Sequence, residues 1–177
     1  MSKQQWTGSV WVNAPLDEVN GYLADFTRHP EWDDATVRVE QTAPGDATGV
    51  GAEYKAYESL GKVAKVGSGD SFIKDQAGLA KRKVREMILN RRLAWHTHPV
   101  PNIGVSADCA FNLSAENDGT TVTQTVEVST LPGLHAITSF AFRSLDAKQQ
   151  ASWAANLDRL KTAVEHAHAT ALVPAGH

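Results

Sequence analysis

Residues 145–168 form the one long stretch of the chain in which apolar positions recur at helical spacing from end to end. Its repeating positions lie three or four residues apart: Leu145, Gln149, Trp153, Leu157, Leu160, Val164 and Ala167. This spacing places them on one face of an α-helix. A helix of about six turns is only marginally stable alone, so its apolar face must cover another part of the fold. The sequence therefore predicts a long amphipathic C-terminal helix packed on a partner surface.

The partner surface is predicted to be a β-sheet. Alternating apolar and polar residues indicate strands at 6–12, 36–41, 52–57, 81–89, 92–98, 105–115 and 120–129. Asp118-Gly119, between the last two, is a strong hairpin signal. After the first strand, Asn13 is placed to cap a short helix through Phe26, and a second short turn is expected at 29–32. This order predicts an α+β protein with one antiparallel sheet, covered on one face by the last helix.

Composition favours one domain over residues 1–177, with its core at about 6–168 and a frayed tail at 169–177. Seventeen Lys and Arg against 20 Asp and Glu, a formal charge of −3, give no general electrostatic case for nucleic acid. The basic run at 81–85 indicates a solvated strand face rather than a phosphate patch. No stretch is apolar enough for membrane insertion and no signal core is present. With a single cysteine, Cys109, no intramolecular disulfide is expected, and a reducing cytoplasm is the default compartment.

Strand alternation predicts which side chains face the interior. Arg82, Val84, Glu86 and Ile88 share one face of their strand, and Gln124 lies among the inward residues of the last strand. A mostly apolar interior with a few polar groups is typical of a small-molecule pocket. Alternatively, Glu86 and Gln124 bond each other or Arg82, or lie in water at strand ends. Periodicity alone leaves both interpretations open.

Metal and nucleotide sites are not expected. His96 and His98 share a strand face, but they lie opposite Trp95 and so point outward, with no third ligand at a readable spacing. The chain has no glycine-rich phosphate loop, no nucleophile elbow and no zinc-protease motif. We therefore expect no cofactor and no metal.

A series of short motifs resembles the SRPBCC or START-like superfamily, which includes polyketide cyclases/dehydrases, aromatase/cyclases, birch-pollen-allergen-like proteins and lipid-transfer domains. In chain order they are Asn13-Ala14-Pro15, Glu18-Val19, Tyr22-Leu23-Ala24-Asp25-Phe26, Pro30-Glu31-Trp32-Asp33, Gly49-Val50-Gly51-Ala52, Arg92-Leu93-Ala94-Trp95, Gly119-Thr120-Thr121-Val122-Thr123 and Leu157-Asp158-Arg159-Leu160-Lys161. The resemblance implies a helix-grip fold, in which a curved seven-stranded antiparallel sheet wraps a long C-terminal helix. Two short helices between strands one and two close one end over an apolar cavity. Residues 58–80 exceed the usual hairpin there, and they form either a lid containing Phe72 or an extended hairpin.

Two functional hypotheses follow, because the same fold serves enzymes and binders. The first is an enzyme of polyketide cyclase or dehydrase type, in which burial raises the pKa of Glu86 so that it acts as a base. A structural Glu86–Arg82 pair is the alternative role for that carboxylate. The second hypothesis is a non-catalytic carrier or sensor of an apolar small molecule or lipid. Either protein would be a monomer or homodimer that takes a hydrophobic or polyketide-like aromatic molecule. The candidate ligand contacts are Tyr54, Phe72, Arg82, Trp95, Phe111, Gln124, Gln149, Trp153 and Asn156.

Overall fold

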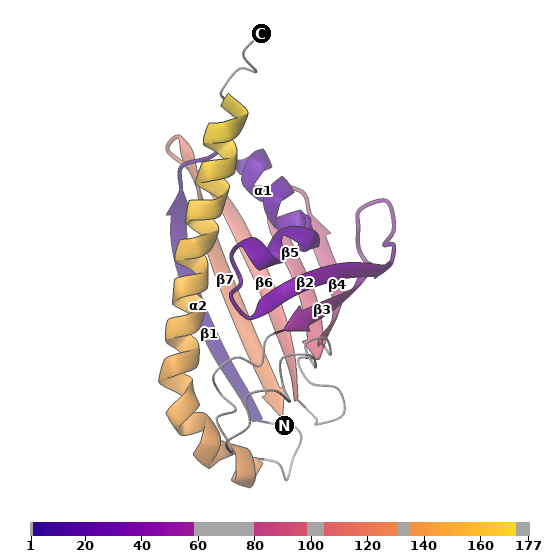
Figure 1. The fold of residues 1–177 in the computed structure, drawn as a ribbon, viewed down its shortest axis with the longest axis vertical. Helices are drawn as coiled ribbons and strands as arrows, with labels where there is room; N and C mark the ends of the chain where they lie inside the picture. Colours follow the sequence, from indigo (N-terminus) through magenta and orange to yellow (C-terminus); the bar gives the residue numbers. More distant parts are fainter. Residues whose placement is uncertain (1, 59–79, 99–104, 131–134, 173–177) are drawn as a thin grey trace.

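The computed structural model describes residues 2–58, 80–98, 105–130 and 135–172, with only the backbone described at 135–149. Seven antiparallel strands form one sheet in the order β1-β7-β6-β5-β4-β3-β2 (Figure 1). Their bounds are β1 Ser2–Val12, β2 Thr36–Ala43, β3 Glu53–Glu58, β4 Ala80–Ile88, β5 Arg92–His98, β6 Val105–Glu116 and β7 Gly119–Thr130. The helices are α1 Leu16–Ala24, the 3-10 helix η1 Phe26–Glu31, and α2 His135–Leu172. The predicted α+β architecture is confirmed.

The turns between the strands follow their residue types. Asn90 lies in the middle of the β4–β5 turn with φ 56°, and Asn117 opens the β6–β7 turn with φ 53°. Asparagine tolerates this left-handed conformation better than most residues. These tight turns fix the pairing of β4 with β5 and of β6 with β7, and so decide which side chains share the inner face of the sheet.

Helix α2 is longer than the sequence predicts, because it begins at His135 rather than near residue 145. The added turns carry Thr, Ser and Phe residues, which have modest helix propensity. In the C-terminal half, the predicted stripe is confirmed. Leu157, Leu160 and Val164 are buried against the rest of the core. Figure 1 shows α2 running along the β1–β7 side of the sheet, with α1 near its C-terminal end.

The first helix does not begin as predicted. Its N-cap is Pro15, with no side-chain capping bond, so the expected cap by Asn13 does not form. The Asn13 backbone N–H instead donates to Glu165 Oε1 of α2 at 2.8 Å. At η1 the Asp25 carboxylate accepts from the Thr27 backbone N–H at 3.0 Å and supplies the cap. The ends of β1 and α2 are therefore joined directly, and α1 and η1 close one end of the sheet.

Candidate functional site

The inner face of the sheet is arranged in rows set by the strand register. One row places Phe111 of β6 between Gln124 of β7 and Leu93 of β5. A second row places Cys109 between Val126 and Trp95. A third contains Ala107, Thr97, Arg82 and Tyr54, from β6 to β3. The interior is bounded by these rows and by α2, and η1 covers one end of it.

The end of the interior beneath η1 is filled by aromatic rings. Phe26 stacks on Tyr54 with ring centroids 4.5 Å apart and meets the edge of Trp95 at 5.4 Å. Phe111 contacts Trp95 at 5.6 Å and Trp32 at 5.7 Å. Because Trp95 and Phe111 are almost wholly covered by protein, they form a packed wall. Tyr54 is only partly buried and marks the border of this packed region.

A buried polar cluster lies beside the aromatic wall. Arg82 is 5% exposed, and its guanidinium Nη1 donates to His29 Nδ1 at 2.6 Å. Its Nη2 contacts Thr36 Oγ1 at 2.7 Å and Asp33 Oδ2 at 3.4 Å. A guanidinium can only donate, so Nδ1 is the acceptor and the neutral His29 ring carries its proton on Nε2. Arg82 thus faces inward as predicted and is held by protein partners.

The electrostatics of the cluster keep His29 uncharged. Complete burial, followed by the charge of Arg82, holds the pKa of His29 well below its ordinary value of 6.5. An interaction with the Leu23 backbone carbonyl acts in the opposite direction. The positive charge of the cluster therefore resides on Arg82, with the Asp33 carboxylate as its counter-ion.

Asn156 extends the cluster to α2. Its Nδ2 donates to Asp33 Oδ1 at 3.2 Å, and its Oδ1 accepts from Arg159 Nη2. Arg159 also donates through Nε to the backbone carbonyl of Trp32 at 3.1 Å. Both amide atoms of Asn156 are thus used within the protein, and this residue ties the end of η1 to α2.

On the β1 side of the interior, the aromatic rings are only partly buried. Trp153 of α2 meets Trp6 of β1 with ring centroids 5.5 Å apart, and both rings are partly exposed. The side chains of Gln124 on β7 and Thr97 on β5 are buried on the inner face of the sheet, and neither Gln124 Oε1 nor Thr97 Oγ1 has a hydrogen-bond partner in the described part of the chain. Thr97 was not among the predicted site residues, although its alternation with Trp95 indicated its inward direction.

Glu86 does not face the interior, and this prediction is wrong. A β-bulge between Val84 and Glu86 shifts the register against β5. As a result Met87 packs on the core, while Glu86 Oε2 accepts from Arg92 Nε at 2.6 Å on the other face of the sheet. Ile88, also expected inside, is 44% exposed. The alternative pairing of Glu86 with Arg82 is wrong as well.

The remaining candidates are placed as follows. His96 and His98 lie on the outer face, as alternation predicts, with ring centroids 4.8 Å apart. No group of three or more potential metal ligands occurs within the described residues. Phe72 lies outside the described residues, and Gln149 lies in the part of α2 described by its backbone alone. Among the described helices, none is long and apolar enough to span a membrane.

Comparison with known proteins gives structural matches. No protein-family model and no curated protein sequence matches the chain. Among solved structures, the Zhui aromatase/cyclase from Streptomyces sp. R1128 has a TM-score of 0.66 and 15% identity, covering 93% of this chain and 94% of that one. A START superfamily protein from Mycobacterium smegmatis has a TM-score of 0.60 and 12% identity, over 94% and 98% of the two chains. Ara h 8.0201 has a TM-score of 0.59 and 12% identity, over 92% and 98%. The predicted helix-grip fold is therefore confirmed.

Proposed function

We propose that this helix-grip domain binds a small, mainly apolar molecule between the sheet and α2, in the part of the interior away from η1. The observation that carries the proposal is the state of Gln124. Its side chain is 5% exposed, yet its Oε1 has no hydrogen-bond partner among the described residues. A buried acceptor left without a partner costs about 1–3 kcal/mol. A ligand hydroxyl or N–H would remove this cost.

The surroundings of Gln124 support a ligand of modest size. Gly8 lies directly opposite Gln124 on β1, and the space above it is occupied by the ring of Trp6 and the side chain of Leu157. The partly exposed rings of Trp6 and Trp153 lie on the same side, whereas Phe111 on the other side is completely buried. The rings on the β1 and α2 side of Gln124 are therefore less buried than Phe111. An apolar wall with a few polar groups is what small-molecule sites usually present.

A catalytic role is the second candidate. The fold likeness to an aromatase/cyclase extends over 93% of this chain, and it is consistent with cyclisation or dehydration of a polyketide-type substrate. Burial, with a smaller contribution from Asp25, raises the pKa of Tyr54, so its hydroxyl stays protonated and can donate to a carbonyl oxygen. Glu86 has no part in this proposal, because it lies on the outer face, paired with Arg92. We therefore propose binding first and catalysis second.

The binding proposal is tested by quenching of tryptophan fluorescence with two probes, naphthalene and 2-naphthol. They share one ring system and differ by a single hydroxyl group. Wild-type protein is expected to prefer 2-naphthol by about two- to tenfold, the value of one net hydrogen bond. Gln124→Leu should lose this preference while still binding naphthalene. Thr125→Val, an outward-facing change on the same strand, is the matched control and should keep it. Absence of saturable quenching by both probes, or equal affinities in wild type, would contradict the proposal.

The catalytic candidate is tested with a linear poly-β-ketone mimic, following cyclised product by chromatography. Tyr54→Phe should reduce turnover, and Glu86→Gln should leave it unchanged. If wild-type protein binds 2-naphthol but forms no cyclised product, the chain acts as a carrier. If Glu86→Gln abolishes turnover, the assignment of Glu86 to the outer face is refuted.

A further inference from the structure

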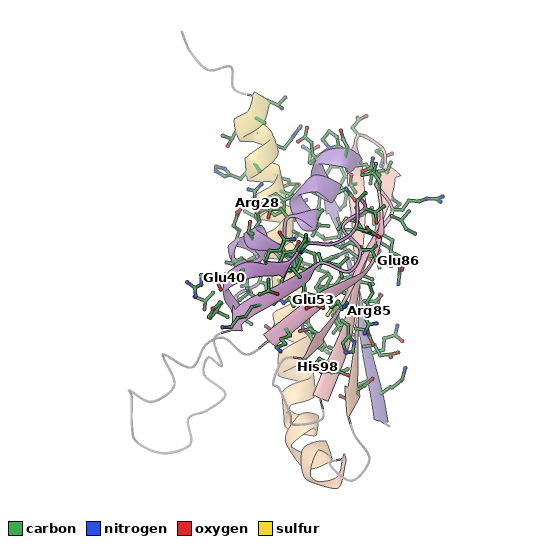
Figure 2. The ribbon with its side chains drawn as sticks, turned by 90° about the vertical axis from the view of Figure 1, so that its right-hand side faces the viewer. Arg28, Glu40, Glu53, Arg85, Glu86 and His98 are labelled. Atoms are coloured by element: carbon green, nitrogen blue, oxygen red, sulfur yellow. The ribbon has the colours of Figure 1, made fainter. Side chains whose placement is uncertain are left out.

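The outer face of the sheet contains a hollow of about 510 Å³ over β3, β4 and β5. Among the described residues, four exposed or half-exposed cations line it together with one carboxylate, Glu53; the cations are Lys55, Lys81, Lys83 and Arg85. His98 closes one side, and Figure 2 shows Glu53, Arg85 and His98 gathered over these strands. The whole chain has a formal charge of −3, whereas the described side chains that line this outer hollow carry a net positive charge.

One row of the outer hollow is electrically balanced. The strand register places Glu53, Lys83, His96 and Asp108 side by side, from β3 to β6. Lys83 Nζ pairs with Glu53 Oε1 at 2.8 Å, and His96 Nδ1 contacts Asp108 Oδ1 at 2.7 Å. Opposite charges on neighbouring strands stabilise a sheet. The charged side chains of this row are therefore already paired within the protein.

The next row is not balanced. It places Lys55 directly opposite Lys81, and Lys81 directly opposite His98. Like charges in directly opposed positions destabilise a sheet. Lys81 forms no ion pair with any residue that the structure describes, and the ring of His98 is held against His96. Two lysines and a histidine thus occupy neighbouring positions on three adjacent strands, at a spacing of about 4.8 Å per strand.

The nearest carboxylate does not neutralise this row. Glu40 lies opposite Lys55 on β2, but its Oε2 accepts from the Tyr57 hydroxyl at 2.9 Å and its Oε1 pairs with Arg38 at 3.2 Å. Lys55 Nζ instead lies 4.7 Å from the centroid of the Tyr57 ring. The position of Lys55 is therefore fixed by an aromatic ring, and its charge remains available to an anion.

We propose that the outer hollow binds the phosphate group of a small molecule, with Lys55, Lys81 and His98 as the phosphate contacts. Lysine is a common phosphate ligand, and charge-assisted bonds to phosphate oxygens are strong. The volume suits a small molecule, since ligand sites commonly measure about 300–1,000 Å³. A protein partner would need about 800 Å² of complementary surface on each side, which makes a small anion the better fit. The three proposed phosphate contacts lie on the outer face of the sheet, although the hollow also reaches Tyr54 and Arg82 at the edge of the interior.

The test is isothermal titration calorimetry of the full chain with sodium pyrophosphate, with inorganic phosphate and sodium sulfate as comparison anions. Lys81→Gln is expected to weaken pyrophosphate binding about tenfold, through loss of one charge-assisted contact. Glu53→Gln should tighten it, because it removes the one carboxylate among the described residues that line the hollow. Lys3→Gln makes the same charge change on the exposed end of β1 and should have no effect. Circular dichroism verifies that each variant is folded.

Pyrophosphate binding that weakens in Lys81→Gln and tightens in Glu53→Gln supports the site. Three results overturn it: no heat of binding in wild type, equal weakening by Lys81→Gln and Lys3→Gln, or equal affinity for sulfate and pyrophosphate. Binding of an acidic polypeptide such as polyglutamate without binding of pyrophosphate also overturns it, because the face is then a protein-docking surface. The fluorescence titration with 2-naphthol should be unchanged in Lys81→Gln, which separates this site from the interior one.

Discussion

His29 should make the stability of the protein depend on pH in a way that one substitution removes. In the unfolded chain this histidine has an ordinary pKa near 6.5, whereas burial and then the Arg82 charge hold its folded-state pKa well below that. As the pH falls below 6.5, the unfolded chain takes up a proton that the folded chain does not. The contribution of neutral His29 to the free energy of unfolding is therefore complete above pH 6.5, and it is lost as the pH falls toward the folded-state pKa.

The size of the effect follows from one proton. While folded His29 stays neutral, the free energy of unfolding should fall by about 1.4 kcal/mol for each pH unit below 6.5. Asparagine can place an acceptor oxygen near the position of Nδ1, so His29→Asn should retain a bond from Arg82. It loses the ring contacts with Phe26 at 4.5 Å and Trp32 at 4.9 Å. We expect this variant to be less stable at neutral pH but to lack this contribution to the pH slope.

The assay is urea unfolding followed by tryptophan fluorescence at pH 7.5, 6.5 and 5.5. Other groups titrate in the same range, so the informative quantity is the difference between wild type and His29→Asn at each pH. That difference should shrink as the pH falls. His166→Asn, an exposed change on α2, is the control and should show a constant difference. A constant difference for His29→Asn as well would refute the inference that the buried ring excludes a proton.

Three further substitutions test the packing of the fold by urea unfolding at pH 7.5. Gly8→Ala would place a Cβ 2.5 Å from the Trp6 ring and 3.1 Å from Leu157, so it should cost about 1–3 kcal/mol. Gly21→Ala, where nothing lies within 4 Å, should instead stabilise by about 0.5–1 kcal/mol; the opposite order would contradict the described packing. Arg82→Met should cost about 3–5 kcal/mol, because it leaves Asp33 without its buried counter-ion, and a loss below 1 kcal/mol would show that the cluster is not a stabilising unit.

Local patterns predicted the sheet well because its side-chain period is fixed. Alternation within single strands placed Arg82 and Gln124 on the inner face, and both are buried there. The same rule failed at Glu86, since a single bulged residue reverses the phase of everything after it and alternation contains no signal for a bulge. The proposed role of Glu86 as a base depended on its predicted position on the inner face.

Contacts distant in sequence could not be predicted. His29 and Arg82 are 53 residues apart, and Asn156 reaches Asp33 across 123 residues. In the sequence, each of these residues is of a type that commonly lies on a protein surface. They form a buried cluster only because η1, β4 and α2 come together in the fold. The helical face on which Asn156 lies was predictable, but its hydrogen-bond partners were not. The structure shows that this residue, predicted as a ligand contact, links η1 to α2.

The pairing of the first strand with the last also determines when the sheet can close during synthesis. Within the described residues, β1 pairs only with β7, so that Trp6 lies opposite Val126 and Val12 opposite Thr120. A nascent chain therefore exposes an unpaired first strand until about 120 further residues have left the ribosome. Pairing over such separations is slow, because loop-closure entropy must be overcome before the contacts form. Until β7 is made, the backbone N–H and C=O groups of β1 lack their partners in the sheet.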